Sequence, residues 1–547
     1  MQNRPLMISH ILSHAAAAHG DREIVSRLVD EPIWRYDFAA CAARVAKAAN
    51  MLEALGISPG DRVSSLAWNT HRHFELFYAV PGIGAVLHTA NPRLHKDQIL
   101  YTIRHAGSSV LFFERNFLPL VEKLRPRLPL IRRFIMLSDA ERLIPGEIGA
   151  ESYEVLIAGY PAEHNWRAFD ENSAAFLCYT SGTTGDPKGV LYSHRSVVLH
   201  GMAGGLSGAL ALSAFDCVMP CTSLYHCTAW GLPFMVLING CKLVLPCDKM
   251  DGASLHELIV DEGVTFSGGV PTIWTMYLAF LEQSGQSPAL LDRVVIGGSA
   301  VPRAMAETFK RKHGVNVRQI WGMTETSPIG VLSTPTPRLA TMGEDQLDEV
   351  LWTRQGRLQF GIELKVVDDE GVELPRDGES AGRLLVRGPW VIDRYFESDA
   401  PGADADGWFD TGDIATLDRF GFMRITDRAK DVIKSGGEWI SSIDIENAAM
   451  AYPGVRFAGV IGVYDPKWEE RPFLVVEPHP GATITSDAVR SFLSERITRW
   501  WLPETILVAE VPLTATGKVD KKRMRDVYAR PPVGDHLLAS NPFRNDA

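Results

Sequence analysis

Apolar residues recur at helical spacing over residues 39–55, and this pattern ends at Gly56. A short apolar run then predicts a strand, and the same order of helix and strand recurs further along the chain. The predicted helices cover residues 39–55, 96–107 and 255–264, and the predicted strands cover residues 61–68, 108–113, 265–271 and 290–302. This alternation predicts an α/β fold of layered sheets, with ligands bound near the carboxyl ends of the strands.

The pattern changes from about residue 357 onward. Alternating residues over 357–391 predict β-hairpin strands with turns at Asp369–Gly371 and Asp377–Gly378. A compact α/β pattern follows, with helices near 442–452 and 486–499 and strands over 457–463 and 473–478. We therefore expect a large N-terminal domain of layered α/β sheets with a β-rich subdomain (1–427), a hinge (428–430) and a small, mobile α+β C-terminal domain (431–547).

Composition and charge narrow the class of protein. The 547 residues carry a formal net charge of −11, which argues against nucleic acid as the main partner but leaves small anionic substrates open. The N-terminus has no unbroken apolar run typical of a signal peptide. The most apolar stretch, 76–90, contains Pro81 and is too short for a transmembrane segment. A cytoplasmic location is expected.

Five of the seven cysteines crowd one region around His226. They are Cys217, Cys221, Cys227, Cys241 and Cys247. A metal site is one interpretation, but their spacing matches no CxxC pair. Lone cysteines in apolar runs usually pack as small hydrophobic residues, and this second interpretation is favoured.

The stretch CYTSGTTGDPKGV (178–190) combines glycines, hydroxyl side chains and one lysine. Glycines let backbone N–H groups converge on an anion, hydroxyls add further donors, and Lys188 adds a positive charge. The combination predicts a polyphosphate site. It is not the P-loop of NTPases, because Gly189 and Val190 follow the lysine in place of Ser or Thr.

This stretch resembles the signature of the adenylate-forming superfamily, which includes acyl-CoA synthetases, luciferases and peptide-synthetase adenylation domains. Three further segments resemble the motifs of this superfamily in the same order along the chain. They are WGMTETSP (321–328), GWFDTGDIATLDRFGFMRITDRAKDVIKSGGEW (407–439) and PLTATGKVDKK (512–522). The resemblance covers nearly the whole chain.

The resemblance implies the reaction and the ATP contacts. Members of the superfamily join a carboxylate to the α-phosphate of ATP and release pyrophosphate, a reaction that needs Mg²⁺ and fixed donors around the triphosphate. The implied phosphate contacts are Thr180, Ser181, Gly182, Thr183, Thr184 and Lys188, with Thr324 at the α-phosphate. The implied nucleotide contacts are Gly297, Gly298, Ser299, Trp321 and Gly322. Glu325, assisted by Thr180, would bind Mg²⁺.

The resemblance also implies roles for the later motifs. Asp413 would accept both ribose hydroxyls, Arg428 would donate nearby, and Lys430 is at the hinge position. Lys518 would stabilise the transition state of adenylation. A second set of residues would approach the site when the small domain turns, and the two glycines among them would leave room for the CoA arm: Lys434, Gly436, Gly437 and Trp439.

Further segments of the sequence resemble those of medium- and long-chain fatty acyl-CoA ligases and methylthiopropionate-CoA ligases. An apolar acid (fatty, methylthioalkanoic or aryl-alkanoic) and CoA are therefore the implied substrates, and a homodimer is a further implication. His226 and Trp230 would line the acyl channel, although each is also compatible with a role in the core. The alternative function is a nucleotide-binding NTPase or regulator without acyl transfer.

Overall fold

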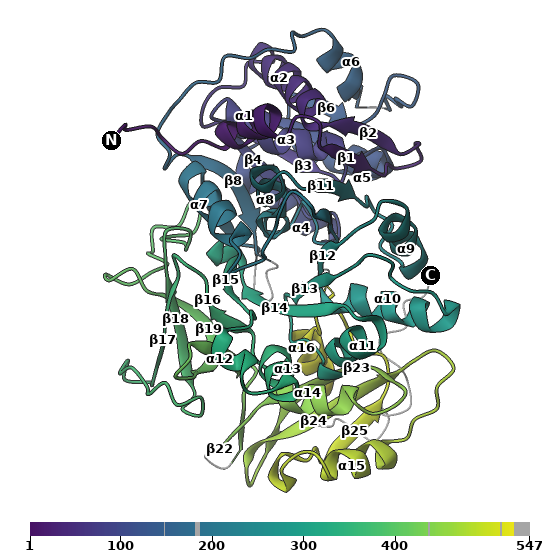
Figure 1. Cartoon of the computed structure of the whole chain (residues 1–547), viewed down its shortest axis with the longest axis vertical. Helices are drawn as coiled ribbons and strands as arrows, with labels where there is room; N and C mark the ends of the chain where they lie inside the picture. The colour runs from purple at the N-terminus through teal and green to yellow at the C-terminus, as the bar shows by residue number, and fades with distance from the viewer. Residues whose placement is uncertain (147, 181–185, 436–437, 515–516, 530–547) are drawn as a thin grey trace.

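Three β-sheets organise the part of the chain that the structure describes (Figure 1). The computed structural model describes all residues except 147, 181–185, 436–437, 515–516 and 530–547. One sheet has the strand order β7-β6-β5-β3-β4-β8-β9, and all neighbours pair in parallel except β8 and β9. Its strands are β3 (Arg62–Leu66), β4 (Val86–Thr89), β5 (Val110–Phe113), β6 (Arg133–Met136), β7 (Glu151–Ser152), β8 (Ala174–Tyr179) and β9 (Gly189–Ser193).

The largest sheet has the order β17-β18-β19-β20-β16-β15-β14-β13-β12-β10-β11-β1-β2. The neighbours from β14 to β1 pair in parallel, whereas the neighbours from β14 to β17 pair antiparallel and form the β-rich part. Its strands are β1 (Glu23–Ser26), β2 (Trp34–Asp37), β10 (Cys217–Pro220), β11 (Lys242–Leu245), β12 (Phe266–Gly269), β13 (Arg293–Gly297), β14 (Asn316–Gly322), β15 (Ile329–Leu332), β16 (Gly356–Leu358), β17 (Glu363–Val367), β18 (Gly382–Arg387), β19 (Phe409–Leu417) and β20 (Phe422–Arg428).

The C-terminal part has its own sheet and its own apolar core. Its strand order is β22-β21-β24-β23, and β25 pairs with β24. Figure 1 shows this part below the parallel strands β12–β14. Its elements are β21 (Ile433–Ser435), β22 (Glu438–Ile440), β23 (Val455–Asp465), β24 (Glu469–Pro478), β25 (Thr505–Val508), α14 (Ser442–Met450), α15 (Ser486–Ser494), η5 (Arg499–Trp501) and α16 (Lys521–Tyr528).

The remaining helices precede residue 354, and many begin at a capping side chain. In α2 the Asp37 carboxylate accepts the N–H of Ala40, and the buried residues recur at helical spacing. These helices are α1 (Ile8–Ala18), α2 (Phe38–Ala54), α3 (His71–Gly82), α4 (Lys96–Ala106), α5 (Leu118–Leu124), α6 (Tyr153–Ala158), α7 (His194–Gly205), α8 (Leu232–Asn239), α9 (Gly252–Asp261), α10 (Pro271–Ser284), α11 (Arg303–His313), α12 (Pro337–Ala340) and α13 (Glu344–Thr353), with short turns η1 (Arg115–Phe117), η2 (Arg125–Arg127), η3 (Cys227–Gly231) and η4 (Thr324–Thr326).

The layered α/β fold with a separate C-terminal domain is confirmed. The helix predicted over 39–55 is α2, and the elements predicted at 61–68, 96–107 and 108–113 are β3, α4 and β5. Helix α3 and strand β4, which lie between β3 and α4, were not predicted. The helix predicted over 486–499 was too long, because α15 ends at Ser494. Ile497, in a bend, and Trp500, in η5, still pack on the C-terminal core, so the apolar spacing continues beyond the helix. In the described part of the chain, no helix combines the length and apolar character needed to cross a bilayer.

Candidate active site

A cavity of about 1450 Å³ opens between the large sheet and the C-terminal part. One wall comes from the segments that follow β8, β10, β12, β13 and β14 at their carboxyl ends. The opposite wall includes Leu513, Thr514, residues 517–522 and Arg525 of the C-terminal part. Ligands of α/β proteins usually bind at the carboxyl ends of parallel strands, so the fold places the cavity where the sequence predicted it.

Two hydrogen bonds close the base of the phosphate loop. The N–H of Thr180 donates to the carbonyl of Lys188 at 2.9 Å, and the N–H of Lys188 donates to Oγ1 of Thr180 at 3.1 Å. The loop joins β8 to β9, which pair antiparallel, and both Thr180 and Lys188 line the cavity. The other predicted phosphate contacts lie outside the described residues: Ser181, Gly182, Thr183 and Thr184.

Glu325 brings a buried carboxylate to the cavity from η4, directly after β14. The Tyr395 hydroxyl donates to Oε1 of Glu325 at 2.8 Å. Among the described residues, no cationic side chain forms an ion pair with this carboxylate, and no hydrogen bond reaches Oε2. This donor set fits Mg²⁺ shared with substrate phosphates. Within the described ranges, no three His, Cys, Asp or Glu side chains gather as a metal site of their own.

Thr324 is held from two sides. The Tyr192 hydroxyl donates to the carbonyl of Thr324 at 2.7 Å, and the Cys227 sulfur lies 3.2 Å from Oγ1 of Thr324. Burial raises the pKa of the Cys227 thiol to about 12, so the thiol stays neutral near pH 7. Because Thr324 and Cys227 are both buried, the contact between them gives the Thr324 hydroxyl a fixed position at the cavity wall.

Asp413 is buried and receives two donors. The indole N–H of Trp321 donates to Oδ2 at 2.8 Å, and Nε of Arg428 lies 2.7 Å from Oδ1. Burial raises the pKa of Asp413, while Arg428 and then Trp321 oppose this shift. Arg428 lines the cavity, whereas Asp413 and Trp321 lie outside its lining. In β14 the alternate residues Ile320 and Gly322 line the cavity, so Trp321 between them points to the other face of the strand. The contact of Trp321 with adenine stays a prediction.

Gly297 at the end of β13 and Gly298 directly after it allow close approach at two points. A Cβ at Gly297 would lie 2.3 Å from Cγ2 of Ile320, so this glycine permits β13 and β14 to pack closely. Gly298 has a φ of +86° and lines the cavity together with Ser299. A Cβ at Gly298 would lie 3.7 Å from Cε of Lys518, so the Lys518 side chain reaches the end of β13.

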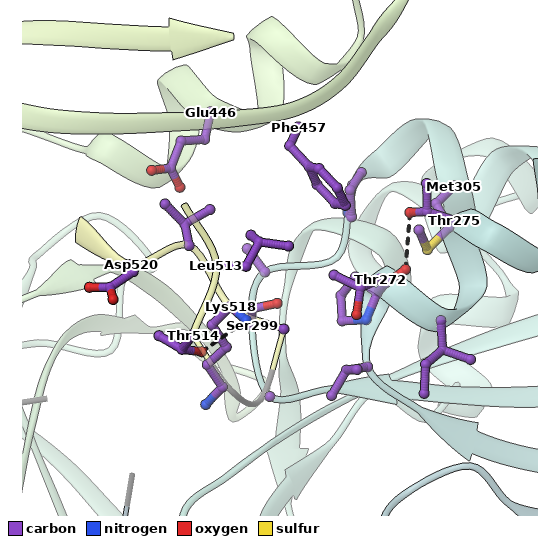
Figure 2. Close-up of a pocket in the computed structure, with 18 of the residues that line it drawn as sticks. Thr272, Thr275, Ser299, Met305, Glu446, Phe457, Leu513, Thr514, Lys518 and Asp520 are labelled. Atoms are coloured by element: carbon purple, nitrogen blue, oxygen red, sulfur yellow. Dashed lines mark hydrogen bonds between the residues drawn. The ribbon is translucent and has the colours of Figure 1, made fainter. Parts of the chain in front are cut away.

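Lys518 enters the cavity from the loop before α16. Figure 2 shows Leu513, Thr514 and Lys518 on one wall, opposite Thr272. Gly517 has a φ of +77°, and a Cβ there would lie 2.7 Å from Oγ1 of Thr272. Burial lowers the pKa of Lys518, and Arg428 lowers it further. The loop thus holds a desolvated ammonium group in the cavity that Thr180, Lys188 and Thr324 also line.

The structure describes the second predicted face of the C-terminal part only at Lys434 and in the backbone of Trp439. Lys430 lines the cavity, but the side chain of Lys434 is exposed in β21 and is not part of the lining. Trp439 pairs with Lys434 in the β21–β22 register. Gly436 and Gly437, the predicted CoA-side glycines, lie outside the described residues. Lys518 and Lys434 therefore occupy different surfaces of this part of the chain.

Contacts between β20 and the start of α14 join the two parts of the chain. Arg424 pairs with Asp444 at 2.7 Å. The Asp427 carboxylate accepts the backbone N–H of Ser442 at 2.7 Å, where the positive end of the α14 dipole favours a negative charge. These contacts accompany the arrangement in which Lys518 lies in the cavity.

Both predicted acyl-channel residues line the cavity. Burial, followed by the charge of Lys518, lowers the pKa of His226 to about 4, so its imidazole is neutral near pH 7. Trp230 belongs to η3, where Cys227, Thr228, Ala229 and Trp230 all have positive φ. A left-handed conformation costs roughly 1–2 kcal/mol per non-glycine residue, so the surrounding packing must hold this turn in place.

All seven cysteines are buried and none forms a disulfide. Cys217 and Cys221 pack in one apolar core, whereas Cys227 and Cys241 pack in another. The packing of these cysteines therefore confirms their interpretation as small core residues. Cys227 has an additional contact, with Thr324, that the sequence did not indicate.

The sequence analysis missed Tyr395 and Tyr192, which hold Glu325 and Thr324. Tyr395 lies in an irregular segment between β18 and β19, where no periodic pattern indicates which side chain points to the site. Tyr192 lies in β9 and alternates with exposed Leu191, a pattern typical of an ordinary half-buried strand. Neither residue type nor spacing distinguished them from core residues.

The chain is similar to known proteins along most of its length. The AMP-binding enzyme family matches residues 12–396, and the AMP-binding enzyme C-terminal domain matches residues 444–518. A 3-methylmercaptopropionyl-CoA ligase from Ruegeria lacuscaerulensis is 45% identical, over 96% of this chain and 98% of the relative. A medium-chain-fatty-acid–CoA ligase from Ectopseudomonas oleovorans is 44% identical, over 99% and 98%. A long-chain-fatty-acid–CoA ligase from Thermus thermophilus is 41% identical, over 96% of each chain.

Among solved structures, an anthranilate CoA ligase in complex with anthranoyl-AMP has the same fold. The TM-score is 0.86 at 24% sequence identity, and the similarity covers 96% of this chain and 98% of the solved chain.

Proposed function

This chain belongs to the AMP-binding enzyme family, and we propose that it is an ATP-dependent carboxylic acid–CoA ligase. It activates an apolar acid of the medium- or long-chain fatty or methylthioalkanoic class, and it releases AMP and pyrophosphate. Similarity of 41–45% over nearly the full length to ligases named for such acids supports this function. The observation that carries it is that Lys518 enters the same cavity as Thr180, Lys188 and Glu325.

The first half-reaction forms the acyl-adenylate. A carboxylate oxygen of the acid attacks the α-phosphorus of ATP, and the bond to pyrophosphate breaks. Negative charge builds up around the α-phosphate, so fixed cationic donors accelerate the step. Lys518 supplies such a donor from the C-terminal loop, Thr324 donates from its fixed hydroxyl, and Lys188 binds the outer phosphates.

Mg²⁺ would be held by Glu325, through the oxygen that Tyr395 does not contact, with Thr180 nearby. When bound, the ion supplies Lewis-acid stabilisation of the triphosphate. The protein contributes a buried carboxylate without a cationic partner in the described residues.

The second half-reaction transfers the acyl group to CoA. The CoA thiolate attacks the acyl carbonyl carbon, and AMP leaves with the oxygen that joined it to the acid. We propose that the C-terminal part turns about Lys430 between the half-reactions, so that Lys518 leaves the cavity and the surface with Lys434, Gly436 and Gly437 approaches it. The separation of Lys518 and Lys434 on two surfaces supports this proposal.

The acyl group would lie against His226 and Trp230. A neutral imidazole and an indole suit an apolar acid, because neither adds a charge that the acid would have to desolvate. Aryl-alkanoic acids also fit this description. The length preference depends on the left-handed turn at Cys227–Gly231, which sets the position of the Trp230 ring.

The alternative function, an NTPase or nucleotide-binding regulator, releases pyrophosphate or phosphate without an acid. The test is pyrophosphate release from Mg·ATP with and without a panel of carboxylic acids. We expect release that depends on a medium-chain acid and rises further with CoA. Equal release without any acid would support the alternative and contradict the ligase function.

Two broader properties stay proposals. The protein would act in the cytoplasm, and it would form a homodimer. A single monomeric mass by light scattering at assay concentrations would contradict the dimer.

A further inference from the structure

A short segment of the β-rich part crosses to the phosphate loop and to Glu325. This segment, Ile392–Phe396, is here called the 392–396 strap. Its Ile392 N–H donates to the backbone carbonyl of Glu325 at 2.8 Å, and its Phe396 N–H donates to the carbonyl of Gly189 at 2.8 Å. The strap therefore joins the end of the phosphate loop to η4 through backbone hydrogen bonds at each end.

Tyr395 adds two side-chain contacts at the centre of the strap. Its hydroxyl donates to Oε1 of Glu325 at 2.8 Å. The Lys188 ammonium lies 4.8 Å from the centre of its ring, within the range of a cation–π contact. One side chain thus touches both the carboxylate and the ammonium group that face the triphosphate in the proposed function.

Lys188 and Glu325 line the same cavity but, in the described part of the chain, they form no ion pair with each other. Opposite charges in one partly dehydrated cavity attract strongly, and a direct pair would occupy the groups that ATP and a metal ion need. Tyr395 offers each group its own partner: a hydroxyl for one carboxylate oxygen and a ring face for the ammonium. The second carboxylate oxygen stays available.

We propose that Tyr395 is a positioning residue for Mg·ATP. It holds Glu325 with Oε2 free for the metal ion, and it holds Lys188 toward the phosphates, so that the two groups do not pair with each other in the empty site. This inference rests on the proposed function and adds a residue to it. A purely structural role for Tyr395 is the competing explanation, because the strap also packs against the fold.

Tyr395→Phe separates these explanations. It removes the hydroxyl but keeps the ring beneath Lys188 and the backbone hydrogen bonds of the strap. Loss of a side chain that orients a metal ligand typically weakens metal binding 10–100-fold, so we expect the Mg²⁺ concentration for half-maximal ATP binding to rise about tenfold. Tyr395→Leu should also weaken ATP binding without metal, because it removes the ring from Lys188.

The measurement is calorimetric ATP binding to the full chain, in EDTA and across a Mg²⁺ series, with melting temperatures as a check on folding. Tyr464→Phe is the matched control, because Tyr464 is 80% exposed in the C-terminal part. In a Glu325→Gln background, Tyr395→Phe should have little further effect, since the hydroxyl acts through that carboxylate.

The results distinguish a failure of the proposed function from a failure of the positioning role of Tyr395. If the wild-type protein binds no ATP with or without Mg²⁺, the proposed function itself fails. If the wild-type protein binds Mg·ATP and folded Tyr395→Phe shows the same Mg²⁺ dependence, the positioning role of Tyr395 is wrong while the function stands. An equal loss of ATP binding with and without metal in Tyr395→Phe would also overturn the role through Glu325.

Discussion

Replacing Lys518 with alanine should block one half-reaction and spare the other. The ammonium group enters the cavity from the loop before α16, and a Cβ at Gly298 would lie 3.7 Å from Cε of Lys518. A single fixed donor to charge that develops in a transition state contributes about 10²–10³ in rate, or about 3–4 kcal/mol. We therefore expect adenylate formation by Lys518→Ala to fall about 10²–10³-fold.

The assay separates the half-reactions. Adenylate formation is followed by pyrophosphate release in a single turnover without CoA, and thioester formation is followed with supplied acyl-adenylate and CoA. Thioester formation by Lys518→Ala should stay within about threefold of wild type, because in the proposed rotation Lys518 leaves the cavity before that step. Lys522→Ala is the control, since Lys522 lines the same wall and tests whether any positive charge there suffices.

The pH dependence provides an independent check on the same residue. In its proposed role Lys518 acts in the protonated form, and burial together with Arg428 lowers its pKa from the ordinary value. Adenylation should therefore be lost as pH rises through this lowered pKa, which lies below the range in which exposed lysines titrate. Thioester formation from supplied adenylate should not decrease over the same pH range.

A bulky residue at Gly437, outside the described residues, should give the reverse pattern: adenylate forms and thioester does not. Equal loss of both half-reactions in folded Lys518→Ala and Gly437→Leu would contradict the proposal that two surfaces of the C-terminal part serve the half-reactions in turn. Equal loss of adenylation in Lys518→Ala and Lys522→Ala would show that general positive charge, and not the position of Lys518, matters.

Three further substitutions probe other contacts. Glu325→Gln should lower adenylation about 10²-fold or more, since metal Lewis acidity contributes several kcal/mol, and unchanged Mg²⁺ dependence would argue against Glu325 as a ligand. Trp230→Ala should shift the kcat/KM ratio between long and short acids about tenfold, whereas uniform loss across the series indicates a core role. Arg424→Glu should slow adenylation about threefold, and adding Asp444→Arg should restore it; no restoration would mean that the pair does not hold the two parts together.

The order of elements and the chemical motifs were predictable from the sequence because they depend on local pattern. The helix from Phe38 to Ala54 follows its apolar spacing and a capping aspartate. The phosphate loop depends on glycines and one lysine close together in the chain. Lys518 and Glu325 were identified in another way, because the short motifs that hold them resemble motifs of the adenylate-forming superfamily.

Long-range pairing and irregular segments were not predictable in this way. Strand β1 pairs with β11, although more than two hundred residues separate Ile24 from its partner Leu243. Tyr395 reaches Glu325 from an irregular segment, and the left-handed turn at Cys227–Gly231 has no asparagine or aspartate to indicate positive φ. Such features depend on packing across the whole fold, which a local pattern does not encode.

The positions of the two carboxylate oxygens after turnover show whether an acyl-adenylate forms. The acid is supplied with both carboxylate oxygens as ¹⁸O, together with Mg·ATP and CoA, and the products are analysed by mass spectrometry. Attack of the carboxylate on the α-phosphate predicts one ¹⁸O atom in each AMP, one in the thioester carbonyl, and equal amounts of AMP and thioester. AMP without label, or label in ADP or inorganic phosphate, would contradict an acyl-adenylate and with it the account of this site.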